Sequence, residues 1–118
     1  MDRETMRKRT KEFASRIVRL VASLPNNRIG DVLGRQILKS GTSIGANYRE
    51  ALRSSSQRQF ISMIEISLRE AEETHYWLEL IQDAGIFEPE MLLEIMDECR
   101  QLIAILTATA KSAKRNNE

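Results

Sequence analysis

The Glu72–His75 pair has the spacing of a metal-binding motif, because Glu-x-x-His places two ligands one turn apart on a helix. Di-iron four-helix bundles use two such motifs together with two further glutamates. This chain has a single histidine, so one subunit cannot supply the second motif. Glu72 also falls with Glu65 and Glu79 on one outward face of the predicted helix. The pattern favours a solvated charged face, and we expect no metal site.

Cys99 and the carboxylates Glu70 and Glu73 are the other candidates for reactive groups. Cys99 lies in an apolar helical pattern with Ile95 and Leu102, which is typical of a small core residue. The sequence places no histidine beside Cys99 that would activate it as a nucleophile. Glu70 and Glu73 are compatible with an acid–base pair, but their basic neighbours favour ion pairing. We therefore expect no catalytic residue, no cofactor and a protein that is not an enzyme.

The segment SGTSIGANYREA, residues 40–51, is rich in glycine and hydroxyl groups, as a phosphate-binding loop is. A P-loop needs a Gly-Lys-Ser/Thr sequence that follows a strand, and both the lysine and the strand pattern are missing. At helical spacing Gly41 and Gly45 instead line the edge of an apolar stripe. Glycine inside a helix costs about 1 kcal/mol relative to alanine, and a close helix contact would offset that cost. We expect such a contact rather than a ligand cradle.

A polar face of the same segment carries Ser40, Ser43 and Asn47 at spacings of three and four. Two interpretations are open, a hydrogen-bonded boundary with another helix or subunit and a small-molecule site. No nucleophile or base is concentrated there, so we favour the boundary.

Helical periodicity runs through the whole chain, without a strand pattern or an internal repeat. Pro25 and two asparagines end the first periodic segment, serines 54–56 end the second and Gly85 ends the third. The pattern predicts a single domain over residues 1–118. Its predicted fold class is all-α, an antiparallel up-down-up-down four-helix bundle. The predicted helices span about residues 5–23, 30–53, 57–84 and 89–111, followed by a frayed tail KRNNE.

Charge is segregated along the chain although its net value is only +1. Residues 1–58 contain 13 basic and 5 acidic side chains, whereas residues 59–99 contain 1 basic and 11 acidic ones.

The single cysteine excludes an internal disulfide and fits a cytoplasmic protein. The longest apolar run, LIAIL, is far shorter than the roughly 20 residues that span a bilayer, so we expect no membrane contact.

The predicted third helix has more apolar surface than one core contact requires. Phe60, Ile64 and Leu78 belong to one stripe. A second stripe, rotated by about a quarter turn, includes the only tryptophan. Because a bundle helix needs one such stripe, the surplus predicts a subunit interface. The tentative interface residues are Met63, Ile66, Trp77 and Leu80.

The predicted second helix carries basic residues on the face opposite its apolar stripe. Two interpretations are open, a solvated face and a row of phosphate contacts for nucleic acid. The first is the more common in proteins, and the second is an alternative function, with RNA as the ligand. The acids of the third and fourth helices would also neutralise this row within or between subunits. The tentative nucleic-acid contacts are Arg28, Arg35, Lys39, Arg49 and Arg53.

Two blocks, GRQILKSGTSIGANYREA and EAEETHYWLEL, are close to the pattern of the ribosomal-RNA intervening-sequence proteins. The resemblance spans roughly residues 10–106. It implies an antiparallel four-helix bundle assembled as a ring-shaped homopentamer, and it implies no known enzymatic activity. We therefore expect a homo-oligomeric scaffold or interaction protein whose partner is another copy of itself. No small-molecule ligand is expected.

Overall fold

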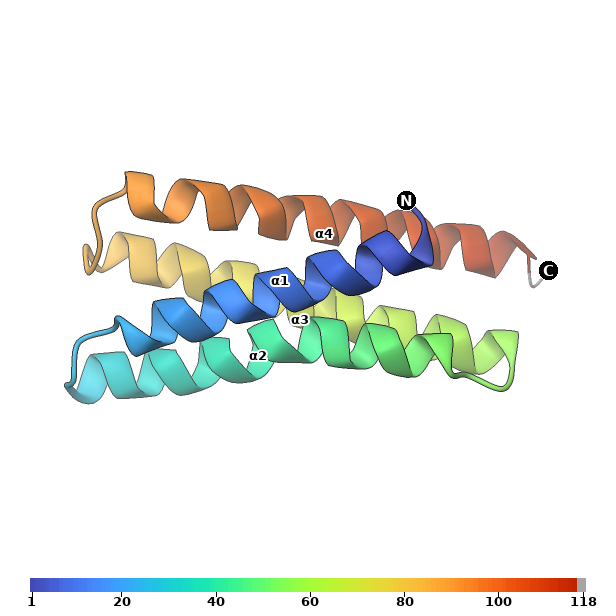
Figure 1. Cartoon of the computed structure of the whole chain (residues 1–118), viewed down its shortest axis with the longest axis horizontal. Coiled ribbons are helices and arrows are strands. Elements are labelled where there is room, and N and C mark those ends of the chain that lie inside the picture. The colour runs from blue at the N-terminus through green and yellow to red at the C-terminus, as the bar shows by residue number, and fades with distance from the viewer. Residues whose placement is uncertain (117–118) are drawn as a thin grey trace.

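The computed structural model describes residues 1–116. Within that range the chain forms four helices and no strand, which confirms the predicted all-α class. Each helix runs antiparallel to the one before it, so that the molecule is an elongated up-down-up-down bundle (Figure 1). The four helices are α1 (Arg3–Ala22), α2 (Arg28–Leu52), α3 (Gln57–Asp83) and α4 (Glu90–Asn116).

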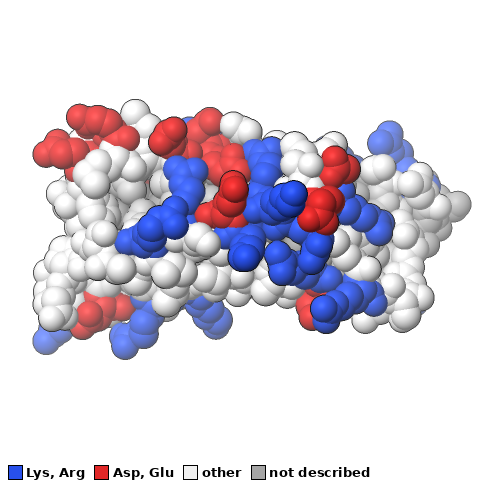
Figure 2. All heavy atoms as spheres, viewed as in Figure 1, with Lys and Arg blue, Asp and Glu red and all other residues white. Residues whose placement is uncertain are grey.

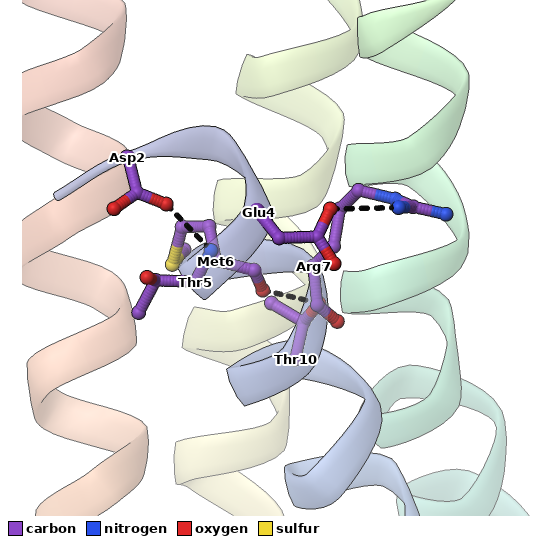
Figure 3. Close-up of polar contacts among 6 residues, drawn as sticks. All are labelled: Asp2, Glu4, Thr5, Met6, Arg7 and Thr10. Carbon is purple, nitrogen blue, oxygen red and sulfur yellow. Dashed lines mark hydrogen bonds and ion pairs between the residues drawn. The ribbon is translucent and has the colours of Figure 1, made fainter.

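Three helices begin at side chains that accept a hydrogen bond from a free backbone N–H of the first turn. Asp2 accepts from the N–H of Thr5 at the start of α1, as Figure 3 shows. Asn27 accepts from Gly30 at the start of α2, and Ser56 accepts from Gln59 at the start of α3. The first two caps explain why α1 and α2 each begin two residues before the predicted starts.

The end of α3 was predicted correctly, whereas the end of α4 was not. Gly85 follows α3 with a φ of 67°, which confirms the predicted stop before the last link. The predicted end of α4 near Lys111 is wrong, since the helix continues to Asn116. Ala113 in this last part is buried, and its carbonyl accepts from the Gln57 side chain at 3.3 Å. Lys114 pairs with Glu65 at 2.8 Å, so tertiary contacts hold a segment whose sequence reads as frayed.

The core is built from one stripe of each helix. Thr10 and Thr74 are the largest polar side chains within it, and each hydroxyl donates to a carbonyl one turn earlier. Donating to the own helix satisfies the hydroxyl without a partner from another element. The fully buried apolar residues include Phe13 and Ile17 of α1, Ile37 and Ile44 of α2, Ile64 and Leu78 of α3, and Leu102 and Leu106 of α4.

Close packing of α1 on α2 at Gly41 and Gly45 is confirmed. A Cβ atom on Gly41 would lie 2.8 and 2.9 Å from the Cγ1 and Cγ2 atoms of Ile17. A Cβ atom on Gly45 would lie 3.0 Å from the Oγ1 atom of Thr10. Both glycines are buried, so the segment that resembles a phosphate loop is the floor of a helix–helix contact.

Helix α1 crosses the bundle obliquely, from α4 towards the start of α2 (Figure 1). One cluster of polar side chains joins α1 to α4. The Arg9 guanidinium donates to both carboxylate oxygens of Glu98, at 3.0 and 2.7 Å, and to Gln101 at 2.9 Å. These residues are about 90 positions apart in the chain, and sequence reasoning missed the contact.

Candidate interaction surfaces

The four predicted interface residues of α3 lie half-buried along the edge of that helix that is turned towards α2. Met63 and Trp77 pack against the core, and the Trp77 indole N–H donates to Glu73 at 3.0 Å. Two polar contacts on this side of α3 fix the register with α2. Ser67 donates to the Ile44 carbonyl at 2.7 Å, and the Thr74 hydroxyl lies 2.9 Å from that of Ser40.

The predicted polar boundary on α2 is confirmed at Ser40, which is buried against α3. Ser43 donates to the Lys39 carbonyl, and Asn47 donates to the Ser43 carbonyl. Both side chains are thus satisfied by their own helix. This backbone bonding is common for short polar side chains in helices, and the sequence alone does not separate it from cross-helix bonding.

An apolar depression of about 450 Å³ adjoins Leu80, where the start of α2 meets the end of α3. Ile29 is 61% exposed and Val32 is 45% exposed beside it. Arg28, Leu33 and Ala84 complete the lining. Sequence reasoning missed the exposure of Ile29 and Val32. A signal was available, because both lie away from the centre of the inward stripe of α2.

Glu70 and Glu73 lie on the same edge of α3 as the interface residues. The prediction that they form ion pairs is wrong for residues 1–116, where neither carboxylate has a basic group within salt-bridge distance. Burial raises the pKa of Glu70, and the neighbouring Glu73 carboxylate raises it further, while Lys39 and Arg69 oppose the rise. Within residues 1–116, neither acid thus has a cationic partner in contact with it.

The four basic residues of α2 and its C-cap residue Arg53 form an exposed row, which we call the basic lane: Arg28, Arg35, Lys39, Arg49 and Arg53. No member of the basic lane makes an ion pair with another residue of the described chain. Figure 2 shows Lys and Arg gathered over α1 and α2, while Asp and Glu crowd the first part of α4. The charge segregation along the sequence thus becomes a segregation of surfaces.

The candidate reactive groups are dispersed. Cys99 is fully buried, its thiol donates to the Ala71 carbonyl at 3.3 Å, and burial raises its pKa to about 12. The Nδ1 atom of His75 lies 3.3 Å from Glu79, and Glu72 is exposed. Within residues 1–116, no three His, Cys, Asp or Glu side chains come together as a set of metal ligands.

The comparison with known families now decides the identity of this bundle. The sequence model of the family described as 23S rRNA-intervening sequence protein matches residues 4–108. The chain belongs to this family. The match covers both sequence blocks that carry the resemblance, and it includes residues of all four helices.

A solved member of similar architecture is a protein of unknown function from the S23 ribosomal protein family of Bacteroides thetaiotaomicron VPI-5482. Its sequence is 40% identical, and the alignment covers 90% of this chain and 98% of the other with a TM-score of 0.85. No protein with a curated description matches the chain. None of the helices in residues 1–116 has the length and apolar character needed to cross a membrane.

Proposed function

We propose that this member of the family is a non-enzymatic, cytoplasmic scaffold or interaction protein that works as a homo-oligomer. The observation that carries the proposal is the apolar depression between α2 and α3. Ile29 and Val32 expose much of their side chains there, next to the predicted interface residue Leu80. Apolar residues that gather on the surface in this way mark protein–protein contacts.

A second copy of the chain is the partner that this surface favours. Trp77, one turn before Leu80 on α3, extends the apolar surface beside the depression. Met63 and Ile66 lie further along the same edge, beyond Glu70 and Glu73. Five subunits in a ring is the assembly that the resemblance to the family implies, and we adopt that number for the proposal. The cytoplasmic location rests on the single cysteine, which lies buried in the core.

Light scattering on the purified chain at micromolar concentration is expected to give about five times the subunit mass of 13.6 kDa. A Trp77→Ala variant is expected to dissociate at concentrations roughly tenfold or more above those of the wild type, because truncating a central interface tryptophan is among the costliest changes. Leu93→Ala is the control for an apolar truncation outside α3, since Leu93 is 56% exposed on α4. A wild type of subunit mass at these concentrations would refute the proposal.

Nucleic-acid binding through the basic lane is the second candidate. Its support is that all five members are exposed and that none is neutralised by an ion pair within residues 1–116. Arg28 and Arg53 are 25 residues apart, a span of roughly 37 Å on a helix, which is long enough for several phosphates.

The salt dependence of RNA affinity tests this second candidate. Each phosphate contact releases counterions, so that each lost contact should reduce the slope of log affinity against log salt by about one unit. The double variant Arg35→Glu/Arg49→Glu is therefore expected to bind labelled hairpin RNA more weakly, with a slope smaller by about two units. Lys8→Glu on α1 is the control for a single charge reversal outside the basic lane. Equal slopes for wild type and double variant would exclude the basic lane as the RNA site.

A further inference from the structure

We propose that the basic lane of one copy is covered by the interface edge of α3 of a second copy, so that the lane is a protein contact. This inference rests on the proposed homo-oligomer and names its two complementary faces. Four observations carry it: the residue spacing on α3, the spacing on α2, the chemistry of the facing residues and the axial register.

The interface edge of α3 has the spacing of a helix-packing seam. The four predicted interface residues, together with Glu70 and Glu73, recur at intervals of three and four residues from position 63 to position 80. A three–four repeat keeps side chains aligned along a partner helix that packs at a shallow angle. The seam is apolar at both ends and acidic in the middle. A helix that covers it is favoured if it presents basic side chains to this acidic centre.

The basic lane of α2 has the same spacing. Its members, with Val32, Thr42 and Ala46 between them, recur at intervals of four and three residues from position 28 to position 53. Val32, Ala46 and the five basic residues are exposed, and Thr42 is half-buried. Arg35 and Lys39 at the centre of the lane are flanked by Val32 on one side and by Thr42 and Ala46 on the other, with further arginines at both ends. The central part of the lane complements the acidic centre of the α3 seam and its Leu80 end.

One antiparallel alignment of the two seams matches their chemistry at four of six positions. At the other two positions it places Glu70 opposite Thr42 and Met63 opposite Arg49. It places Glu73 opposite Lys39, which pairs opposite charges. It places Trp77 opposite Arg35, where a guanidinium can stack on the indole face. Leu80 then meets Val32, and Ile66 meets Ala46, so that apolar side chains leave water together at both ends.

The axial register gives an independent argument for this alignment. In a closed ring whose axis is parallel to the bundles, neighbouring copies lie at the same height. Within one chain Thr74 lies beside Ser40, and Ser67 beside the Ile44 carbonyl. The neighbour's Lys39 must then lie level with Glu73. The alignment chosen for charge and size is therefore the one that a ring without axial shift requires.

The two faces adjoin within one chain, because Arg28 and Val32 of the basic lane line the same depression as Leu80. Lys39 also lies near enough to Glu70 to favour its charged form, but the two make no ion pair. The charges of both stay without an ion-pair partner in the described chain. A second copy supplies to each face the charge that it lacks, and repetition of this contact joins one copy to the next.

Charge reversal on each face, and on both faces together, tests the inference. Arg35→Glu/Lys39→Glu and Glu70→Lys/Glu73→Lys each place like charges opposite each other where position 39 of one copy meets position 73 of the next. Either double variant is expected to raise the concentration of half-assembly by roughly 100-fold or more, measured by light scattering or analytical ultracentrifugation. The chain that carries all four substitutions restores opposite charges and is expected to assemble within about tenfold of the wild type.

A matched control and a folding measurement make each outcome informative. Lys8→Glu/Lys11→Glu changes the net charge as much as the lane variant does, at exposed positions of α1, and is expected to assemble like the wild type. Far-UV circular dichroism establishes that each variant is folded. Recovery of assembly in the fourfold variant also excludes a loss of folding as the cause of dissociation in the two double variants.

The outcomes separate this inference from the proposed function. A wild type that is monomeric overturns both. A wild type that assembles while both double variants stay assembled overturns only the contact between the basic lane and α3. Double variants of the lane that stay assembled but lose hairpin RNA would assign the lane to nucleic acid and likewise overturn this inference. Dissociation of each double variant with recovery in the fourfold chain is the result that supports it.

Discussion

Replacing Gly30 with alanine is expected to lower the free energy of unfolding by about 3 kcal/mol and the Tm by roughly 10 °C. A Cβ atom at Gly30 would collide with the carbonyl oxygen of Pro25, a backbone atom that no side-chain rotation can move away. Relief requires a shift of the turn before α2. That shift would also disturb the cap in which Asn27 accepts from the Gly30 N–H at 2.9 Å.

Gly34→Ala is the matched control for this prediction, because it makes the same change one turn further along α2. The nearest atoms to a Cβ there are Leu24 Cδ1 at 3.3 Å and Val21 Cγ1 at 3.4 Å. Both are side-chain ends that can shift slightly, so the gain in helix propensity of up to about 1 kcal/mol should outweigh the contact. Thermal unfolding followed by circular dichroism measures both variants. A Gly30→Ala protein that melts within 2 °C of the wild type, a margin of roughly half a kcal/mol, would contradict the steric argument.

Replacing Gly41 with leucine is expected to destabilise the fold by about 3 kcal/mol, at the upper end of the range for overpacked cores. Ile17 stands directly opposite, is fully buried and branches at Cβ, so it has little freedom to turn aside. Helices α1 and α2 would have to separate along their contact. Gly45→Ala should cost less, about 1 kcal/mol, because Thr10 needs to move only slightly.

The Thr10 hydroxyl resists even that small movement, because it donates to the Met6 carbonyl at 2.9 Å (Figure 3). Urea titrations of Gly41→Leu and Gly45→Ala measure the two costs, and Ala104→Leu on the exposed face of α4 serves as the control for the added volume. If both glycine variants were more stable than the wild type, close packing would not explain why glycine stands at these positions.

The order and type of the helices were predictable from the sequence because they depend on local patterns. Apolar residues at spacings of three and four define each inward stripe, and the predicted stripe of α2 is buried at Ile37, Ile44 and Tyr48. Turn residues such as Gly85 separate the segments. The need for a close contact at Gly41 was also predictable, since glycine inside a helix is unfavourable without one.

Helix ends were less predictable where a contact from elsewhere in the chain decides them. The last residues of α4 are mostly polar, and their sequence by itself predicts a frayed end. They stay helical because Gln57 and Glu65 of α3 hold Ala113 and Lys114. Sequence periodicity cannot weigh such contacts, because they join residues about 50 positions apart.

For the candidate surfaces, the sequence alone determined which residues share a face of α2 or α3, because the helical period fixes that. The basic lane is exposed as predicted, and Met63, Ile66, Trp77 and Leu80 share one edge of α3. Only the tertiary structure decided that Ile29 and Val32 lie beside Leu80 in one depression, and that Arg9 reaches Glu98. Both depend on how helices distant in sequence pack and on their relative register. That packing is set by the fit of many side chains together, such as Ile17 against Gly41, and not by the pattern of any single segment.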